Sequence, residues 1–269
     1  MAPQINDRLD LDFTAESFEP ETENFLYTTF GRIVRGDDRV YFGQIFKRLQ
    51  DISPPEFTAA LIQVPDGDIY PELAAHSDIR VAEVPDPIPD HIHLKRPCFS
   101  YYDEYKEQGM TIRIPNLLLE EIHVLEALSE EPHPGIVKYY GCRVRRGWIT
   151  GIALEQHWGD LKSYVRAREE PPIEEGRFFA ALESAIRHVH SCGFAHNDIK
   201  PSNILLNAER MPVLADFNSC RPIGKELRYS RGTPGWTDPD DPWDTSEIWH
   251  DWYGVERVRE WLKASRESS

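Results

Sequence analysis

The feature that most constrains this chain is the segment 193–220, in which polar residues stand at fixed short spacing between apolar runs. The segment reads GFAHNDIKPSNILL, then six residues, then VLADFNSC. It places Asp198, Lys200 and Asn203 in one short stretch and sets Asp216 directly after a second apolar run. Apolar runs of this length bounded by polar turns are typical of buried strands. We therefore expect a rigid base beneath the polar side chains.

These four side chains supply what a metal-bound nucleoside triphosphate requires. Mg²⁺ takes hard oxygen ligands, the migrating phosphoryl group needs a cation, and the attacking hydroxyl needs a proton acceptor. Asn203 and Asp216 can offer the metal its oxygens, and Lys200 can offer the positive charge. Asp198 can offer the carboxylate that orients a hydroxyl nucleophile. The pattern predicts a phosphoryl-transfer site, and the alternative is a polar turn without chemistry.

The segment resembles the catalytic machinery of the protein kinases. HNDIKPSN is similar to their catalytic loop H-x-D-x-K-x-x-N, and Asp216-Phe217-Asn218 is similar to their DFG motif. Four matching positions beginning at His196, followed by Asp-Phe thirteen residues after Asn203, make a chance match improbable. The resemblance implies a Ser or Thr hydroxyl of a protein as acceptor, because kinase-like enzymes acting on small molecules usually lack the equivalent of Lys200.

Composition restricts the partners and the compartment. The 269 residues include 30 basic and 46 acidic ones, a net charge of −16, which argues against nucleic acid or an anionic membrane as the main partner. A basic substrate is compatible with this charge. The four cysteines are far apart in the sequence and form no CxxC pair. We expect a reduced, intracellular protein, cytoplasmic or nuclear, with neither an export signal nor a membrane span.

The first third of the chain is expected to lie outside the catalytic machinery. Residues 1–24 are acidic and poor in aromatic residues, which predicts a mobile arm. Two β-rich runs around Gly36-Asp37-Asp38 predict a hairpin, and residues 57–65 predict a further strand. Residues 65–90 are rich in proline and predict a loop or insertion. Together, residues 25–90 form a β-rich segment that is part of the small lobe or appended to it.

Residues 91–157 are expected to form the core of the small lobe. The run HIHLKRPCF predicts a short strand, and the resemblance makes its Lys95 the lysine that contacts the nucleotide phosphates. Lys47 is the competing candidate. An apolar stripe at helical spacing places Glu121 on the inward face of the next helix, where it resembles the αC Glu that pairs with that lysine. The alternative for Glu121 is a surface acid beside Glu120. The family's glycine-rich motif G-x-G-x-x-G is absent from the sequence.

Residues 158–263 are expected to form a shortened helical lobe, followed by a tail at 264–269. The resemblance places the hinge at Glu155 to Trp158, with backbone groups toward the adenine edge. Asp160 faces the ribose or caps the next helix. An amphipathic pattern predicts a buried helix over 174–191. Thr233, in a segment similar to G-T-P-x-Y-x-A-P-E, is placed to reach the catalytic Asp and Lys.

Four further expectations concern the helical lobe. Asn197 replaces the family's Arg, so catalysis should not wait for a phosphate on the activation segment. Asn218 replaces the family's Gly and should tolerate a positive φ. Asp240 stands in for the final Glu of the segment. Asp251, in a helix predicted over Ser246 to Leu262, should hold the catalytic loop.

Together these patterns predict an α+β, two-lobed protein kinase-like fold with a small β-rich N-lobe, an αC helix and a shortened helical C-lobe. The expected function is ATP- and Mg²⁺-dependent phosphoryl transfer to Ser or Thr of a protein. The main alternative is a pseudokinase that serves as a binding or scaffold module. Phosphorylation of a small molecule is a third possibility. The expected partner is a protein substrate, or a protein that covers the shortened lobe.

Overall fold

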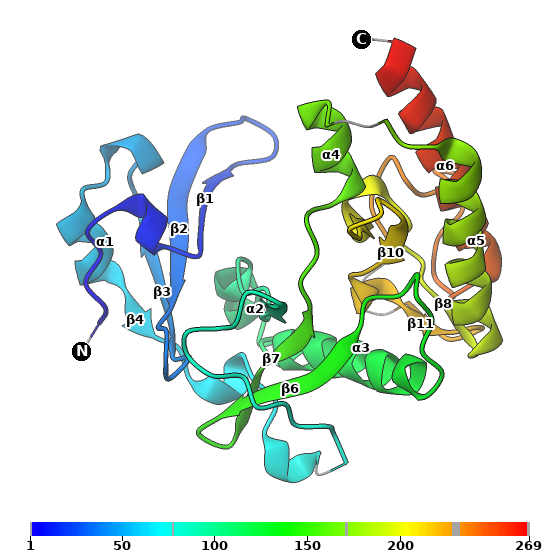
Figure 1. The fold of residues 1–269 in the computed structure, drawn as a ribbon. Coiled ribbons are helices and arrows are strands. Elements are labelled where there is room, and N and C mark those ends of the chain that lie inside the picture. The colour runs from blue at the N-terminus through cyan, green and yellow to red at the C-terminus, as the bar shows by residue number, and fades with distance from the viewer. Residues whose placement is uncertain (1, 77, 170–171, 228–231, 268–269) are drawn as a thin grey trace.

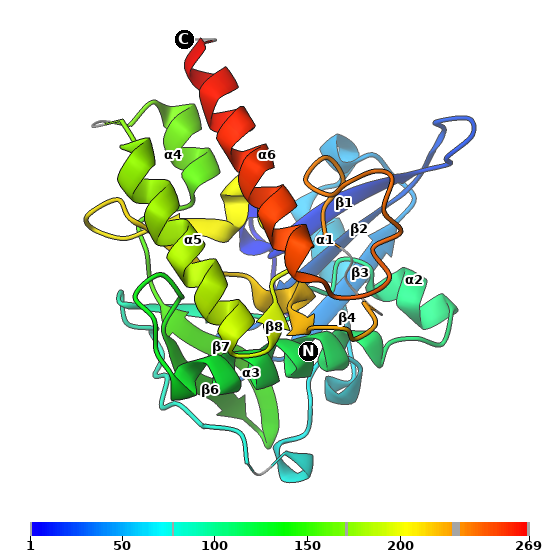
Figure 2. The ribbon, with the colours of Figure 1, turned by 90° about the vertical axis from the view of Figure 1, so that its right-hand side faces the viewer.

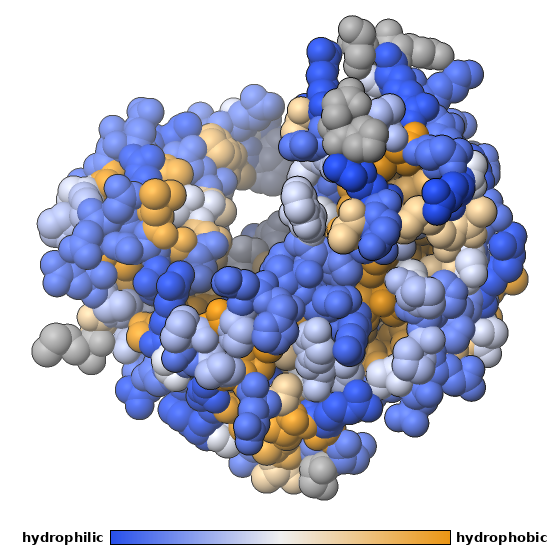
Figure 3. Space-filling view, viewed as in Figure 1, coloured by the Kyte–Doolittle hydropathy of each residue, from blue (hydrophilic) through white to orange (hydrophobic). Residues whose placement is uncertain are grey.

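The computed structural model describes residues 2–76, 78–169, 172–227 and 232–267. Figure 1 shows a sheet of N-terminal strands on the left, a helical lobe on the right, and a smaller sheet with one long helix beneath both. The fold is the expected two-lobed, kinase-like one, with an additional N-terminal sheet. Figure 3 shows an opening on this face between the N-terminal sheet and the helical lobe.

The N-terminal sheet is antiparallel, with strand order β1-β2-β3-β4. Its strands are β1 (Phe13–Phe18), β2 (Phe25–Ile33), β3 (Val40–Ile45) and β4 (Ile62–Gln63). The hairpin predicted around Gly36-Asp37-Asp38 is confirmed, because β2 and β3 pair from Thr28↔Ile45 to Ile33↔Val40.

The mobile arm predicted over 1–24 is wrong for much of that range. Residues 13–18 form β1 and pair along β2, and Ile5 is buried. Phe13 packs against the rings of Phe42 and Phe99, which anchors the strand. The charge of Glu16 was misleading, because its carboxylate accepts a hydrogen bond from the backbone N–H of Leu49, at 2.8 Å, and is not left in solvent.

The strand predicted over 57–65 is wrong for its first half. Helix α1 (Pro54–Ala60) occupies this part, and only Ile62–Gln63 forms a strand. The helix begins with a capping arrangement in which the Glu56 carboxylate accepts hydrogen bonds from the backbone N–H and the hydroxyl of Ser53. Proline at the first helical position fixes φ favourably and loses no hydrogen bond there. The local start signal therefore outweighs the β propensity of the apolar run.

The second sheet has strand order β5-β7-β6 and carries the strand predicted for the run HIHLKRPCF. The strands are β5 (Ile92–Lys95), β6 (Tyr139–Arg145) and β7 (Trp148–Glu155). A short helix, α2 (Tyr102–Glu107), precedes the long helix α3 (Arg113–Glu130), which buries Leu118, Ile122 and Leu125 as its apolar stripe predicts. The described residues of 65–90, all but residue 77, are irregular except for short 3-10 turns and isolated bridges, such as Val81↔Cys142 to β6.

One buried carboxylate joins the two sheets. Asp38 lies at the turn between β2 and β3 and is fully buried. Its carboxylate accepts hydrogen bonds from Arg96, at 2.8 Å, and from the hydroxyl of Thr150 on β7, at 2.7 Å, and lies 3.2 Å from Nε of Arg143 on β6. Its backbone carbonyl accepts a hydrogen bond from the Tyr70 hydroxyl. The N-terminal sheet is thus bonded to the second sheet through one side chain.

The helical lobe is built around α5 (Glu175–Ser191), whose apolar face is buried as the sequence predicts. The other elements of this lobe are α4 (Leu161–Ala167), β8 (Phe194–Ala195), β9 (Ile204–Leu206), β10 (Pro212–Leu214), β11 (Arg221–Pro222) and α6 (Ile248–Glu267). Helix α6 crosses beside α5 (Figure 2). Among the described residues, no helix combines the length and apolar character needed to cross a bilayer.

Candidate active site

The loop between β8 and β9 holds Asp198 in a buried position. One carboxylate oxygen, Oδ2, accepts a hydrogen bond from Lys200 Nζ at 2.6 Å and another from Asn203 Nδ2 at 3.1 Å. The other oxygen, Oδ1, is buried and has no hydrogen-bond partner within the described ranges. A buried carboxylate oxygen without a donor is costly unless a ligand supplies one. Oδ1 is therefore the atom available to a hydroxyl group.

Asn203 is oriented by the same loop. Its Nδ2 donates to the Asp198 backbone carbonyl at 3.0 Å as well as to the Asp198 carboxylate. Because two acceptors fix the NH₂ group, the amide oxygen must point to the other side. The backbone carbonyl of Asn203 accepts a hydrogen bond from Ala215, the residue before Asp216. Asn203 and Asp216 are consequently carried by backbone segments that are hydrogen-bonded to each other.

Lys95, Glu121 and Asp216 meet in one cluster. Lys95 Nζ lies 2.6 Å from Glu121 Oε1 and 2.7 Å from Asp216 Oδ1. The backbone N–H of Phe217 also donates to Glu121 Oε1, at 3.0 Å. The structure therefore brings the predicted lysine, the helix acid and the predicted metal ligand into direct contact, although they are far apart in the sequence.

Burial and charge oppose each other in this cluster. Burial disfavours the charged form of Lys95, but Glu121 and Asp216 outweigh it and raise the lysine pKa. Burial would raise the pKa of Asp216, yet Lys95 holds that pKa below its usual range. For Glu121, burial prevails over the attraction of Lys95 and raises the pKa. Asp216 therefore stays ionised, as a metal ligand must.

Lys47 lies elsewhere. Its Nζ pairs with Glu56 Oε1 at 2.5 Å, and both side chains are exposed. The hydrogen bond from Lys47 lowers the pKa of Glu56 to about 2. In the geometry, Lys95 rather than Lys47 faces Glu121 and Asp216.

Thr233 reaches the catalytic loop as predicted. Its hydroxyl accepts a hydrogen bond from Lys200 Nζ at 2.6 Å, so Lys200 links Thr233 to Asp198. Gly232 must precede it, because φ is +80° and a Cβ would lie 2.8 Å from the Asn197 carbonyl oxygen. Residues 228–231 of the predicted activation segment, 221–240, lie outside the described residues. Asp240 is exposed, and its backbone N–H donates to Asp238.

Asp251 and Asn197 fix the loop from below. Both oxygens of Asp251 accept backbone N–H groups of the loop, from His196 at 2.9 Å and from Asn197 at 2.7 Å. Asn197 is fully buried with φ +61°. Its Nδ2 donates to the carbonyls of Ala195 and Ser219, and its Oδ1 accepts from His250 Nδ1. Asn197 is therefore a structural centre of the loop and does not face a phosphate.

Asn218 does not adopt a positive φ, so the tolerance expected of it stays a prediction. Residues Phe217–Ser219 form a 3-10 turn, and the positive φ, +60°, belongs to Asp216. Backbone bonding explains the difference, because Cys220 N–H bonds back to the Phe217 carbonyl and closes a right-handed turn. Asn218 therefore has no need of the conformational freedom that Gly would provide.

The hinge region ends β7 and leads into α4. The backbone N–H groups of Glu155 and Gln156 donate to Lys138 and His91, so they are bonded within the chain. Asp160 is the N-cap of α4, and its carboxylate accepts from the backbone N–H of Ser163 at 2.7 Å and from the Ser163 hydroxyl at 3.1 Å. The capping alternative is thus confirmed for Asp160.

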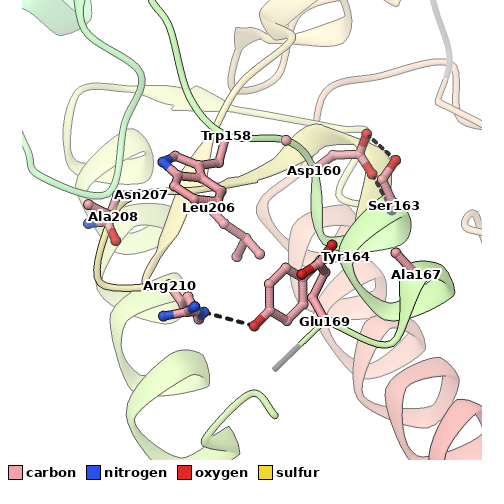
Figure 4. Close-up of a pocket in the computed structure, with 11 residues that line it drawn as sticks. Trp158, Asp160, Ser163, Tyr164, Ala167, Glu169, Leu206, Asn207, Ala208 and Arg210 are labelled. Atoms are coloured by element: carbon pink, nitrogen blue, oxygen red, sulfur yellow. Dashed lines mark hydrogen bonds between the residues drawn. The ribbon is translucent and has the colours of Figure 1, made fainter. Parts of the chain in front are cut away.

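Figure 4 shows Asp160 at the edge of a pocket of about 210 Å³, with the exposed Trp158 at the opposite side. The Arg210 guanidinium donates to the Tyr164 hydroxyl within this pocket. The pocket lies beneath α4, and neither Asp198 nor Asp216 lines it.

The residues present suit Mg²⁺. An ionised Asp216 and the amide oxygen of Asn203, turned away from Asp198, are the hard oxygen ligands that this ion prefers. Among the described residues, no group of three His, Cys, Asp or Glu side chains could hold a metal. A site made of one carboxylate and one amide falls outside such a group, and substrate phosphates commonly complete the shell of Mg²⁺.

Sequence reasoning missed two residues that organise this region, Asp38 and Arg221. Arg221 begins β11 and pairs with Glu120 on α3, next to Glu121. Their partners are far away in the sequence, since Arg221 pairs with Glu120, 101 residues away, and Asp38 bonds to Arg96 and Thr150, 58 and 112 residues away. Their only local signal is a charged residue beside an apolar run.

Comparison with known proteins adds independent findings. A model described as "Protein kinase domain" matches residues 103–241, more than half of the chain. The maternal embryonic leucine zipper kinase of Danio rerio is 38% identical over 121 residues, which are 43% of this chain and 18% of that protein. Serine/threonine-protein kinase PDK1 of Cryptococcus neoformans is 32% identical over 100 residues, 37% of this chain and 8% of that protein.

A third relative is similar. The cAMP-dependent protein kinase, catalytic subunit-like, of Caenorhabditis elegans is 29% identical over 114 residues, 42% of this chain and 29% of that protein. The chain thus spans less than a third of the length of each of these relatives. Lys95 lies before the residues that the family model matches, so its place in the site depends on the geometry.

Proposed function

Because this chain belongs to the protein kinase domain family, we propose that it transfers the γ-phosphoryl group of Mg²⁺-bound ATP to a Ser or Thr hydroxyl of a protein. The observation that carries the proposal is the contact of Lys95 Nζ with both Glu121 and Asp216. A decayed active site need not retain this contact, because a buried ion pair contributes little net stability compared with apolar packing.

Each polar group has a distinct part in the proposed reaction. Asp198 Oδ1 accepts the proton of the attacking hydroxyl, and Lys200 neutralises charge on the migrating phosphoryl group. The hydroxyl oxygen bonds to the γ-phosphorus, the bond to the bridging oxygen breaks, and ADP leaves. Lys95, held by Glu121, binds the remaining phosphates. Asn203 and Asp216 would hold Mg²⁺, which when bound would supply positive charge to the phosphate oxygens.

The proposed partner is a protein substrate, in the cytoplasm or the nucleus. The net charge of −16 supports a basic sequence around the acceptor and disfavours nucleic acid or an anionic membrane. Lys200, placed between Asp198 and Thr233, favours a protein acceptor over a small molecule.

One observation favours a second candidate function, a pseudokinase that binds partners. The sequence has no G-x-G-x-x-G motif, and β5 is an edge strand of its sheet in the part of the chain that the structure describes. Within the described residues, no further strand of this sheet pairs with the open edge of β5 and covers the phosphates of a bound nucleotide. Nucleotide binding would be weak or absent in that case.

Two measurements decide between these functions. Thermal denaturation with millimolar Mg²⁺ and ATP should raise the melting temperature of the wild type, since a ligand of the native state stabilises it. Radiolabelled transfer to basic Ser/Thr peptides should then occur with wild type and fall to background in Asp198→Ala and Asp216→Ala. Asp37→Asn, an exposed substitution remote from the site, is the matched control and should transfer label normally. Absence of both a shift and transfer would establish the scaffold alternative.

A further inference from the structure

Helix α3 carries two adjacent acids, and the proposed reaction uses only one of them. Glu121 binds Lys95, whereas Glu120 binds the guanidinium of Arg221. The Arg221 side chain is 8% exposed and that of Glu120 is 31% exposed, so the pair is largely withdrawn from water. A pair with this degree of burial is screened less than a surface pair.

Arg221 is also bonded to the turn that contains Asp216. Its NH1 group donates to the backbone carbonyls of Asn218, at 2.9 Å, and of Cys220, at 2.6 Å. The same guanidinium therefore joins α3 to two of the three residues that follow Asp216-Phe217. Phe217 N–H already donates to Glu121, so this turn is bonded to Glu121 directly and to Glu120 through Arg221.

The backbone of Arg221 is connected to the catalytic loop. Its carbonyl accepts a hydrogen bond from the Ser246 hydroxyl at 3.1 Å, and that hydroxyl accepts from Asn197 Nδ2 at 2.9 Å. A continuous series of hydrogen bonds therefore runs from the residue before Asp198, through Arg221, to α3.

Two adjacent acids restrain a helix more fully than one. Successive residues project about 100° apart around a helix axis. One ion pair at Glu121 would leave only the apolar packing of α3 to resist small rotations about that contact. A second pair at Glu120 opposes the rotation, because any movement that keeps one pair strains the other.

We propose that Arg221 and Glu120 are positioning residues, which hold α3 against the Asp216 turn so that Glu121 stays on Lys95 without phosphorylation of the activation segment. This role in catalysis rests on the proposed function. The restraint on α3 can be measured independently of it.

The experiment compares full-length wild type with Glu120→Gln, Arg221→Gln, the double variant and Arg221→Lys. Arg257→Gln is the control, because Arg257 forms an exposed pair with Glu260 on α6. Hydrogen exchange of α3 amides reports the restraint, and kcat and KM for Mg·ATP report its catalytic consequence. Each protein is treated with a phosphatase first, and its melting temperature is recorded to verify folding.

We expect exchange in α3 to accelerate about tenfold in Glu120→Gln and Arg221→Gln, and kcat to fall about tenfold with a smaller change in KM. The double variant should resemble Arg221→Gln, since without the guanidinium the Glu120 substitution removes no further part of the pair. Arg221→Lys should recover only part of the loss, because the ammonium restores the charge but not the guanidinium's bonds to the Asn218 and Cys220 carbonyls. Wild type should keep its activity after phosphatase treatment.

Three outcomes would overturn the proposal. The first is that the amides of α3 exchange as slowly in Glu120→Gln as in Arg257→Gln, and the second is that the losses of kcat in the two single variants add in the double variant. The third is that phosphatase treatment abolishes the activity of the wild type. If Arg221→Gln fails to fold, Glu120→Gln decides alone, because its side chain is partly exposed. If wild type neither binds Mg·ATP nor transfers phosphate, the proposed function is wrong, and so is the catalytic part of this proposal. The exchange data still decide whether the Glu120–Arg221 pair restrains α3.

Discussion

Replacing Asp38 with Asn tests whether the N-terminal sheet is an integral part of the small lobe. The substitution removes one charge, keeps the size, and keeps a residue type that tolerates the φ of +57° at this position. After the substitution, Asp86, at 2.6 Å, remains as the acidic partner of the fully buried Arg143. Arg96 and Thr150 lose the carboxylate oxygens to which they donate hydrogen bonds. Removing one partner of a buried ion pair costs about 3–5 kcal/mol. Since Asp86 still compensates Arg143, we expect about 3 kcal/mol.

Urea denaturation gives the free energy of unfolding, and the shift of its midpoint gives the loss. Asp37→Asn is the matched control, because Asp37 pairs with Arg39 on the surface and such pairs contribute at most about 1 kcal/mol. Asp38→Ala should cost about 1 kcal/mol more than Asp38→Asn, because Ala tolerates the left-handed conformation poorly. Equal midpoints for Asp37→Asn and Asp38→Asn would refute the reasoning.

Two further predictions concern the helical lobe. Burial outweighs the nearby Asp241 and lowers the pKa of His250, so below about pH 6.5 the unfolded chain binds a proton that the native protein refuses. Stability should therefore fall as the pH falls from 7 through that window, and His250→Gln should flatten the melting-temperature profile; an unchanged slope would contradict this. Asn197→Gly and Asn197→Ala both remove the buried side-chain hydrogen bonds, which should lower the free energy of unfolding by about 2 kcal/mol or more. Ala should cost about 1 kcal/mol more, because Asn197 has φ +61°; equal urea midpoints would argue against backbone strain here.

The catalytic loop was predictable because its chemistry is local. Asp198, Lys200 and Asn203 lie within six residues, and the hydrogen bonds among them join residues at most five positions apart. Glu121 was predictable because an acid on an apolar helix face requires a cation. Lys95 was proposed from the resemblance to the third kinase strand, with Lys47 as the competing candidate, and the spatial contact with Glu121 distinguishes the two.

The N-terminal sheet was not predictable in the same way. Phe13 joins β1 to β2 and packs on Phe99, a contact between residues that no local pattern relates. Glu16 reads as a solvated charge in the sequence and is a hydrogen-bond acceptor in the fold. For residues 57–60 the deciding information was local, since Ser53, Pro54 and Glu56 form a helix start. The β propensity of the apolar run that follows was a weaker signal than this start.

Three organising residues of this protein share one property. Asp38 joins the two sheets, Asn197 centres the catalytic loop, and Asp216 is the proposed metal ligand, and all three have φ near +60°. Gly would adopt this backbone more easily but has no side chain to bond. Larger polar residues could bond but would pay a greater conformational cost there. Asp and Asn combine tolerance of this conformation with a short polar group whose bonds stay close to the backbone.

The same reasoning changes how Asn197 should be understood. An Arg placed there would have to fit a fully buried site that offers the carbonyl acceptors of Ala195 and Ser219 but also a donor, His250 Nδ1, which an Arg could not accept. The arginine close to this loop is Arg221, and it pairs with Glu120 on α3. Asn197 is therefore not a degenerate Arg. It is the residue type that both the backbone and the hydrogen bonds of this loop require.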